Sequence, residues 1–476
     1  MKAVESENIE IVKSILKNSN EDKKILNLNI KDIDGYNPLL RATSKNNIEI
    51  VQLLIEYANQ HQIILELNEK NNIGFYPLLL ACINSNIKMV KLFIDYANSN
   101  DVILELNDKC ERGNYPILWA CYNNSIEIVK LLIEYANKNN IILKLNEKNK
   151  SGNYALLCAC DKNNIEIVKL LIDYANKNNI ILKMNEKDIN ELYPVLLVCN
   201  NNNNNIIKLL IEYANKYNII LEINGNYINE DYPFLLALNK NNIEMVKIFI
   251  DYAHKNNIIL DLNNKSKNGN GLLLWACENN DIEMVKLLID YSNKNNIMVR
   301  LNEKNEDGYY PLLYAYYYNH IEMVKLLINY ANNSNIIMEV NKKNNSGYYP
   351  LFYACDRNNI EMVKILIDYA YKNNIILEYK ESYYENNSKI KSEIIEILKN
   401  YKKETDIFLP SLVIVINNFT AQEYNQMDIK KDEILVVTNW NCKKRGWVYG
   451  HRKDNKEEKG MFPKVFIKKC EREYIG

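Results

Sequence analysis

The chain has 476 residues with 59 Lys plus Arg and 60 Asp plus Glu, so its formal net charge is −1. A charge this close to zero provides no field that attracts nucleic acid or an anionic membrane. No apolar run approaches the roughly 18 to 20 residues that span a bilayer, and the first residues lack the basic end and apolar stretch of a secretory signal. Composition therefore disfavours a DNA-binding, membrane-spanning or exported protein.

A repeat of 39 residues runs through most of the chain. Tyr recurs at this interval nine times and is always followed by Ala or Ser, at Tyr57, Tyr96, Tyr135, Tyr174, Tyr213, Tyr252, Tyr291, Tyr330 and Tyr369. Gly and Pro keep the same interval in most copies, as in Gly113 and Pro116. Gly-x-x-Pro predicts a turn that opens a helix, because Gly accepts positive φ and Pro favours the first helical position. A partial copy around Ile9 indicates that the array begins with half a unit.

Each copy predicts two short helices with an Asn-Asn break between them. In residues 115–133, the second helix places Ile126, Val129 and Ile133 on one apolar stripe. Helices this short are not stable alone. Stacking of each pair on its neighbours is therefore expected to bury a continuous core along the array.

The order Gly-x-Tyr-Pro-Leu-Leu-x-Ala-Cys, Ile-Glu-x-Val-Lys-Leu-Leu-Ile and Leu-Asn over residues 1–378 resembles the ankyrin repeat. That family uses about 33 residues per unit and opens with Thr-Pro-Leu-His. Here Tyr and Leu occupy the Thr and His slots, as at Tyr76 and Leu79, which departs from the family's usual hydrogen-bonded helix start. Each copy also has about six extra residues. In residues 139–145 their alternating apolar side chains fit either a short extended segment or a longer second helix.

Six of the ten cysteines share one slot of the first helix: Cys82, Cys121, Cys160, Cys199, Cys277 and Cys355. This register predicts small buried side chains, and free thiols in such number favour a reducing, cytoplasmic compartment. The four His are scattered, and no catalytic or metal-binding motif is present. The sequence therefore predicts no metal site, no cofactor and no enzyme activity.

Residues 379–406 are expected to end the array. The polar run 383–388 is interpreted as a connector, and residues 389–401 predict an amphipathic helix. Its apolar residues would cover the open end of the array, as a terminal unit must, and they are Ile390, Ile394, Ile397 and Leu398.

Residues 407–476 predict a small all-β domain, because β-branched residues alternate at 413–416, 433–437 and 464–467. Four ordered motifs resemble a Src-homology 3 (SH3) domain: Val415 to Phe419, Met427 to Glu433, Trp447-Val448 and Gly460 to Ile467. The resemblance implies an SH3-like barrel whose aromatic groove binds a Pro-rich (PxxP-type) segment. The groove and its acidic loop would use Phe419, Glu423, Asp428, Trp447, Pro463 and Phe466. Asn417 and Val465 depart from the family's groove residues, so a barrel with an inactive groove stays an alternative.

The turn tips vary between copies, whereas the second helices are nearly identical. The variable residue two before the Pro slot is Tyr36, Phe75, Asn114, Asn153, Leu192, Asp231, Asn270, Tyr309 or Tyr348. In ankyrin-repeat proteins the partner usually lies across the turn tips and first helices, so the resemblance implies that these residues bind an unknown protein. Neutral drift at exposed turns is the alternative. Trp119 and Trp275, by contrast, are predicted to lie in the core.

The sequence thus predicts an α-solenoid of ankyrin-like helix pairs (residues 1–378), a connector and capping helix (379–406) and an SH3-like barrel (407–476). The predicted function is a non-catalytic adaptor or scaffold, with the array binding one protein and the barrel a Pro-rich segment of another. Two alternatives stay open. One is a structural spacer with an inactive cap, and the other is a targeting subunit of an enzyme complex such as a ubiquitin ligase or a phosphatase.

Overall fold

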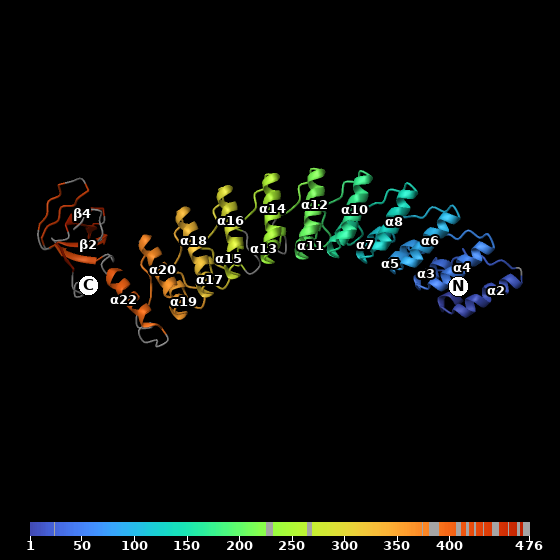
Figure 1. The fold of residues 1–476 in the computed structure, drawn as a ribbon, viewed down its shortest axis with the longest axis horizontal. Coiled ribbons are helices and arrows are strands. Elements are labelled where there is room, and N and C mark those ends of the chain that lie inside the picture. Colours follow the sequence, from blue (N-terminus) through green and yellow to red (C-terminus); the bar gives the residue numbers. More distant parts are fainter. Residues whose placement is uncertain are drawn as a thin grey trace. The chain divides into compact units, whose positions relative to one another are not determined.

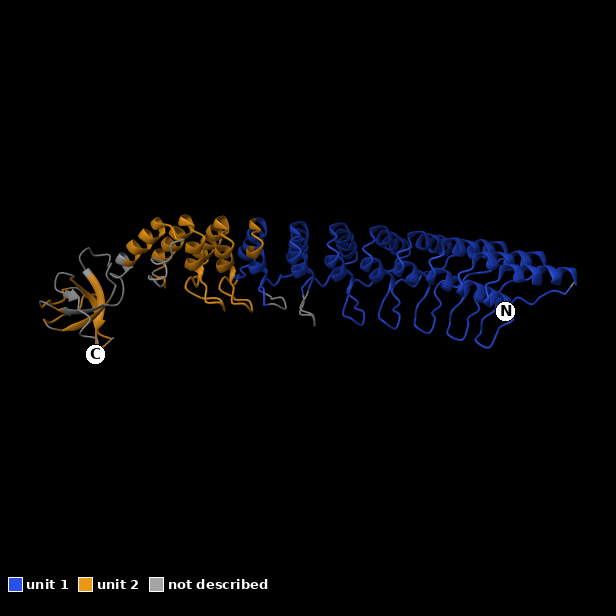
Figure 2. Cartoon of the chain, turned by 90° about the horizontal axis from the view of Figure 1, so that it is seen from below, with its two compact units in different colours: residues 1–276, 283–299 blue, residues 277–282, 300–476 orange. Residues whose placement is uncertain are grey.

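The computed structural model describes most of the chain (Figure 1). The described residues are 1–22, 24–224, 232–263, 269–373, 375–379, 390–405, 411–415, 418–422, 425–431, 433–439, 447–455, 457–463 and 467–469. They separate into two compact units, coloured in Figure 2. Unit 1 comprises residues 1–276 and 283–299, and unit 2 comprises residues 277–282 and 300–476.

Helix pairs repeat at the predicted interval. The first helices are α1 (Lys2–Glu5), α3 (Pro38–Ser44), α5 (Pro77–Ile83), α7 (Pro116–Tyr122), α9 (Ala155–Asp161), α11 (Pro194–Asn200), α13 (Pro233–Asn239), α15 (Leu272–Glu278), α17 (Pro311–Tyr317) and α19 (Pro350–Asp356). The second helices are α2 (Ile9–Glu21), α4 (Ile48–Gln60), α6 (Ile87–Ser99), α8 (Ile126–Lys138), α10 (Ile165–Lys177), α12 (Asn204–Lys216), α14 (Ile243–Lys255), α16 (Ile282–Lys294), α18 (Ile321–Asn333) and α20 (Ile360–Lys372). Within each unit, first helices pack on first helices and second helices on second helices, so the predicted helical solenoid is confirmed.

Asparagine forms the breaks on both sides of the second helix. In the fourth copy, Asn163 between the helices and Asn179 after α10 have φ of 54° and 53°. A short amide side chain tolerates this left-handed region better than most side chains do. The next residue, Asn164, caps α10 by accepting a hydrogen bond from the backbone N–H of Ile167. The predicted Asn-Asn break is therefore a turn followed by a helix cap.

The second helix buries a wider and rotated stripe compared with the predicted one. In α8 the predicted residues Ile126 and Ile133 are only half-buried, although Val129 is buried as expected. The buried side chains of this helix are Ile128, Val129, Leu132, Tyr135 and Ala136. The prediction of one stripe through Ile126 and Ile133 was wrong because α8 packs against α6, α7 and α10 together, which widens and rotates its buried face.

The recurring tyrosine joins each copy to the one before it. The Tyr135 hydroxyl accepts a hydrogen bond from the backbone N–H of Leu104 (3.0 Å) and donates one to the carbonyl oxygen of Val102 (3.3 Å). The same two bonds recur through what we call the tyrosine ladder, formed by Tyr96, Tyr135, Tyr174, Tyr213, Tyr252 and Tyr291. A phenylalanine would pack similarly but would leave both backbone groups unpaired.

The extra residues of each copy form an extended segment, which decides between the two predicted alternatives. Helix α8 ends at Lys138, and beyond the turn Leu143 is buried whereas Ile142 is exposed. Asn107 of the preceding copy holds this segment: its Nδ2 donates to the Ile142 carbonyl (2.8 Å) and its Oδ1 accepts from the Lys144 N–H (2.9 Å). An asparagine ladder repeats both bonds at Asn29, Asn68, Asn107, Asn146, Asn185, Asn302 and Asn341.

The first helix begins without a side-chain cap in most copies. Tyr115 is the N-cap of α7 and makes no capping bond with its side chain. Its hydroxyl instead donates to the carbonyl oxygen of Glu147 in the next copy (2.8 Å). Tyr76 and Tyr154 make the corresponding bonds. The Tyr in the slot of the family's Thr therefore exchanges a local cap for a hydrogen bond between copies.

A final helix, α22 (Ser392–Thr405), packs on α20 as the predicted cap. Of the predicted apolar residues, Ile390, Ile394 and Leu398 are buried, and Ile397 is half-buried. Tyr401, which the sequence analysis did not single out, accepts from the Leu377 N–H (3.0 Å) and donates to the Ile375 carbonyl oxygen (3.3 Å). These are the bonds of the tyrosine ladder, so α22 takes the place of a second helix. The predicted connector 383–388 lies outside the described residues.

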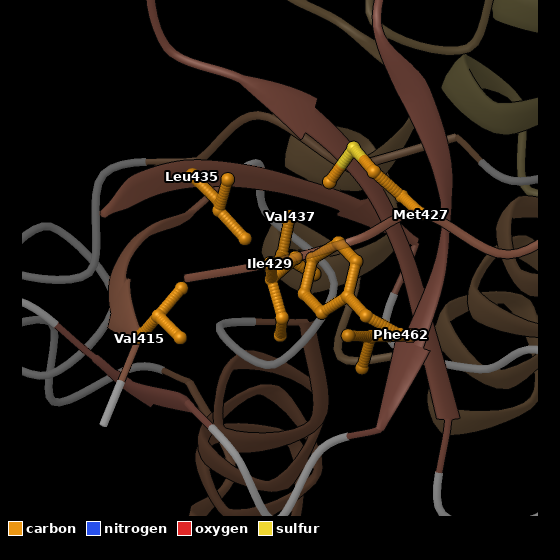
Figure 3. Close-up of a cluster of buried hydrophobic side chains, with 7 residues drawn as sticks. Val415, Met427, Ile429, Leu435, Val437 and Phe462 are labelled. Carbon is orange, nitrogen blue, oxygen red and sulfur yellow. The ribbon is translucent and has the colours of Figure 1, made fainter. Parts of the chain in front are cut away.

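The C-terminal residues form the predicted small β domain. Its strands are β1 (Ser411–Val415), β2 (Ile434–Asn439), β3 (Trp447–Arg452), β4 (Lys459–Pro463) and β5 (Ile467–Lys469), paired antiparallel in the order β4-β3-β2-β1-β5. Side chains from several of these strands meet in a core of Val415, Met427, Ile429, Leu435, Val437, Val448 and Phe462 (Figure 3). The strands predicted at 413–416 and 433–437 correspond to β1 and β2. Most of the third predicted strand, 464–466, lies outside the described residues, and β3 and β4 were not predicted.

Candidate functional site

A turn precedes each first helix, and in most copies a side-chain oxygen holds the turn by accepting backbone hydrogen bonds. These turns project from the stacked helices of unit 1 (Figure 2). In the second copy, Asn71 Oδ1 accepts from the backbone N–H of Ile73 (3.2 Å) and of Phe75 (2.8 Å). Asp32, Asn149, Asp188, Asn305 and Asn344 hold their turns through the corresponding bond. In the third copy this slot holds Cys110, whose side chain has no oxygen to accept such bonds. That turn is closed by backbone bonds, including Gly113 N–H to the Cys110 carbonyl (2.7 Å).

The predicted turn-tip residues lie in different environments. Tyr348 is exposed, with 40% of its surface accessible. Asn114 is buried, and its Oδ1 accepts from Nδ2 of Asn149 in the next turn (2.8 Å). Six others are half-buried, namely Tyr36, Phe75, Asn153, Leu192, Asn270 and Tyr309, and Asp231 lies outside the described residues. The tips therefore present less side-chain surface than their variability suggests.

Aromatic side chains gather on the turns and first helices of unit 2. We call this group the tyrosine cluster, and its members are Tyr309, Tyr314, Tyr317, Tyr318, Tyr348, Phe352 and Tyr353. Tyr309 stacks on Tyr314 with ring centres 4.6 Å apart, and its hydroxyl lies 3.1 Å from that of Tyr353. Tyr318 and Tyr348 are 43% and 40% exposed. Large amphipathic rings held in place by one another are typical of binding hot spots.

Only two members of this cluster, Tyr309 and Tyr348, are among the binding residues predicted from the sequence. The others were missed because only the tip slot was compared between copies. Tyr314 and Tyr317 occupy first-helix slots that hold Trp275 and Glu278 one period earlier. A comparison of every first-helix slot would have found the cluster.

A concave site lies in unit 1, between the turns that precede α7 and α9. It is a cavity of about 460 Å³ lined by Arg112, Asn114, Leu118, Trp119, Tyr122, Asn149, Lys150, Ser151, Asn153 and Cys158. The prediction that Trp119 belongs to the core is wrong, because this side chain is only partly buried and lines the cavity. Its indole Nε1 is buried and has no hydrogen-bond partner among the described residues. An unpaired buried donor costs about 1–3 kcal/mol.

The predicted peptide-binding residues of the β domain are described only in part. Phe419 is half-buried and packs on the core of the domain, and Asp428 is exposed, with its Oδ1 accepting from the Ala421 N–H (2.5 Å). Pro463 is buried and lies opposite Trp447 in the pairing of β3 with β4. The side chain of Trp447 lies outside the described part of the structure. Glu423, Phe466, Asn417 and Val465 lie outside it as well.

The eight cysteines in the described part of the chain are free and buried. The six cysteines of the shared slot are fully buried, as predicted. Burial raises the pKa of the Cys158 thiol to about 12, mainly by desolvation, so this side chain is neutral at physiological pH. Among the described residues no cluster of three His, Cys, Asp or Glu is arranged to hold a metal ion, and no helix there has the length and hydrophobicity to cross a bilayer.

Comparison with known proteins identifies the array. The family model described as ankyrin repeats (3 copies) matches residues 1–103, 61–143, 97–181, 196–300 and 294–376. Among solved structures, an ankyrin-repeat domain from Acinetobacter baumannii AYE is 23% identical with a TM-score of 0.35, covering 45% of this chain and 96% of its own. Another solved ankyrin-repeat protein is 22% identical with a TM-score of 0.31, covering 46% of this chain and 90% of its own. No curated protein is similar enough to match the chain.

Proposed function

Because this chain belongs to the ankyrin-repeat family, whose repeats are protein–protein interaction modules, we propose that it is a non-catalytic adaptor. Its array binds one protein through the turns and first helices, and its C-terminal β domain binds a Pro-rich segment of a second protein. Joining two binding modules in one chain raises the effective concentration of one partner near the other without any new contact.

The observation that carries this proposal is a difference between the two halves of each copy: one half bonds to neighbouring copies, and the other carries the side chains that vary. The second helix and the segment after it form hydrogen bonds with the adjacent copies through the tyrosine and asparagine ladders. The turns and first helices carry the side chains that differ between copies, and in unit 2 these include the exposed rings of Tyr318 and Tyr348. Exposed aromatic residues next to rigid backbone fit a protein interface.

The test of the array's role is affinity capture with the whole chain. Captured proteins are compared between the unaltered protein and the double variant Tyr318→Ser with Tyr348→Ser. Ile337→Ser is the matched control, because Ile337 is 62% exposed but lies on the extended segment after the second helix. The expected result is that at least one partner is lost from the double variant and kept by the control. Identical captured sets from all three proteins would contradict the proposal.

The role of the β domain rests on its resemblance to SH3 domains. The antiparallel strands, the buried Pro463 opposite Trp447 and the exposed carboxylate of Asp428 support it. A polyproline II segment is already extended, so it loses little entropy when it docks on aromatic rings. The test is titration of a fluorescent Pro-x-x-Pro peptide with the full chain and with Trp447→Ala. Binding that is the same for both proteins would leave the domain without this role.

A spacer function is the second candidate, favoured by the ladders themselves. Within each unit they tie successive copies together, as a spacer that holds other groups apart would require. This function predicts that the captured proteins do not change when Tyr318 and Tyr348 are replaced. The capture experiment above therefore separates the two functions.

We place the adaptor in the cytoplasm. The proposal is supported by eight cysteines of the described part that are free and buried, since a chain with this many thiols is suited to a reducing compartment. Imaging of a fluorescent fusion in the native cell tests it. Accumulation in a secretory compartment would contradict the placement.

A further inference from the structure

One junction of unit 1 departs from the repeat at several positions that lie together. Arg112 and Lys150 occupy the tips of successive turns, and Trp119 and Tyr122 lie on α7. In the preceding copy the slots of Arg112, Lys150, Trp119 and Tyr122 hold Ile73, Glu111, Leu80 and Ile83. In the following copy the same slots hold Ser151, Ile189, Cys158 and Asp161. Farther along the chain, Lys267, Trp275 and Tyr317 occupy the slots of Lys150, Trp119 and Tyr122, so this junction is distinguished by Arg112 and by the combination of all four residues. All four departures line the same cavity of about 460 Å³.

The rim of this cavity is cationic. The side chains of Arg112 and Lys150 form no hydrogen bond or ion pair with any residue that the structure describes. Their backbones are joined, because the Lys150 N–H donates to the Arg112 carbonyl oxygen (3.0 Å), so the two charges start from adjacent points. None of the ten lining residues is acidic. The site thus has positive charge that the described part of the protein does not neutralise.

The wall of the cavity is aromatic and apolar. The rings of Trp119 and Tyr122 lie 5.2 Å apart at 84°, and Tyr122 is 45% exposed. Leu118 and Cys158 are buried beside them. The bond between Asn114 and Asn149 holds the two turns at a fixed separation. The site is therefore largely formed before a ligand arrives, and its volume is within the roughly 300–1,000 Å³ of typical ligand sites.

We propose that this cavity binds an acidic segment of the array's protein partner. A Glu or Asp carboxylate lies between Arg112 and Lys150, and a neighbouring apolar side chain packs on Trp119 and Tyr122. Charge complementarity selects the carboxylate, since charge-assisted hydrogen bonds from two otherwise unpaired cations are among the stronger polar contacts. The buried Nε1 of Trp119 can gain an acceptor when the peptide enters. The inference rests on the proposed protein-binding function and specifies the chemistry of one contact.

The experiment uses two pools of fluorescein-labelled peptides and the full chain. Both pools fix Leu beside the central residue and exclude charges elsewhere, and the central residue is Glu in one pool and Gln in the other. The Glu pool is expected to bind about tenfold more tightly or better, because hydrogen bonds between charged groups are stronger than neutral ones; tenfold corresponds to about 1.4 kcal/mol. Added salt is expected to reduce this preference.

The variant Arg112→Ser with Lys150→Asn removes both charges by installing residues that this fold already uses at the same slots, Ser151 and Asn72. It is expected to bind both pools equally. The control is Lys91→Ser with Lys169→Ser, which removes two exposed charges from second helices and is expected to keep the preference. The chain has four Trp, so its indole N–H signals are few, and Trp119→Phe assigns the one that is expected to shift with the Glu pool.

Several outcomes would overturn the assignment. They are equal binding of the two pools by the unaltered chain, an unchanged preference in the charge-removing variant, and a shift confined to another indole signal. Complete displacement of the Glu pool by acetate at equal concentration would identify a simple anion site in place of a peptide site. If the peptide pools fail while partner capture still depends on Tyr318 and Tyr348, the cavity assignment is wrong and the adaptor function stands.

Discussion

The two halves of each copy, the turn with the first helix and the second helix with its extended segment, differ in the hydrogen bonds that their side chains make. In the second helix and its extended segment, side chains such as Tyr135 and Asn107 bond to backbone groups of the adjacent copy. In the turns and first helices, the backbone is held but many side chains are not, and these side chains differ between copies. Identity between copies in the second helix thus accompanies bonds across the stack, whereas the variable positions include exposed side chains such as Tyr348 and buried, bonded ones such as Asn114.

The backbone of the turns is constrained as well, as two glycines with positive φ show. Gly152 has φ of 82°, and a Cβ built there would lie 2.7 Å from the Cα of Asp188 in the next turn. Gly347 has φ of 84°, but a Cβ there would meet nothing within 4 Å. Gly152→Ala is expected to destabilise by about 3 kcal/mol, of which the left-handed conformation contributes about 1–2 kcal/mol and the clash the rest.

Gly347→Ala has only the cost of the left-handed backbone conformation and no clash, so it is expected to lower the free energy of unfolding by about 1–2 kcal/mol. Urea unfolding of both variants, followed by circular dichroism, measures the difference. Glu191 shows that the fold tolerates this conformation in a residue with a side chain, at φ of 63°. Equal losses for the two variants would mean that contact between turns contributes little.

The tyrosine ladder is tested by removing one hydroxyl. Tyr135→Phe keeps the buried ring but leaves the Leu104 N–H and the Val102 carbonyl oxygen without their partner. The expected loss is about 2 kcal/mol, since each unpaired buried polar group costs about 1–3 kcal/mol and water can reach the partly buried carbonyl. Tyr122→Phe is the control, because Tyr122 is 45% exposed and is expected to change stability by less than about 0.5 kcal/mol. The comparison of the two halves fails if both variants unfold at the same urea concentration.

The sequence predicted what depends on local pattern. Residue type and spacing were enough to predict the period and the helix pairs. They also predicted the positive φ of Gly113, the Pro at the start of α7 and the burial of Ile394 in the capping helix. The hydroxyl partners did not follow, because Tyr135 bonds to a residue 31 positions earlier. Only the register of one copy on the next brings them together. The extended segment around Ile142 stayed undecided for the same reason, since the asparagine that holds it belongs to another copy.

The candidate sites were predicted less well than the fold. Trp119 was assigned to the core because a large apolar residue on a short helix is usually buried. The cavity that it lines is formed together with Arg112, Lys150 and Tyr122, which belong to two turns and a helix end. A single slot compared along the chain cannot show that four departures surround one space. The signal was nevertheless present in the sequence, as a coincidence of departures at one junction.

The smallest expected effect concerns a helix cap in unit 2. His320 is the N-cap of α18 and makes no capping bond with its side chain, whereas Asn359 caps α20 by accepting from the Met362 N–H. His320→Asn restores the residue that most second helices use and is expected to stabilise by about 1 kcal/mol at neutral pH. The reverse change, Asn359→His, is expected to destabilise by a similar amount. Opposite shifts of the urea midpoint would confirm that the cap decides the effect.

The same position gives a pH dependence with a definite sign. Burial lowers the pKa of the His320 imidazole below its ordinary value of 6.5, and a hydrogen bond with the Cys277 backbone offsets part of this shift. As the pH falls below about 6.5, the unfolded chain takes up a proton before the folded chain does, so stability falls with pH through the lowered folded pKa. His320→Asn has no such proton to bind. The variant's excess in free energy of unfolding over the unaltered chain is therefore expected to grow as the pH falls from neutral to about 5. An excess that stays constant over this range would show that burial of His320 has no energetic consequence.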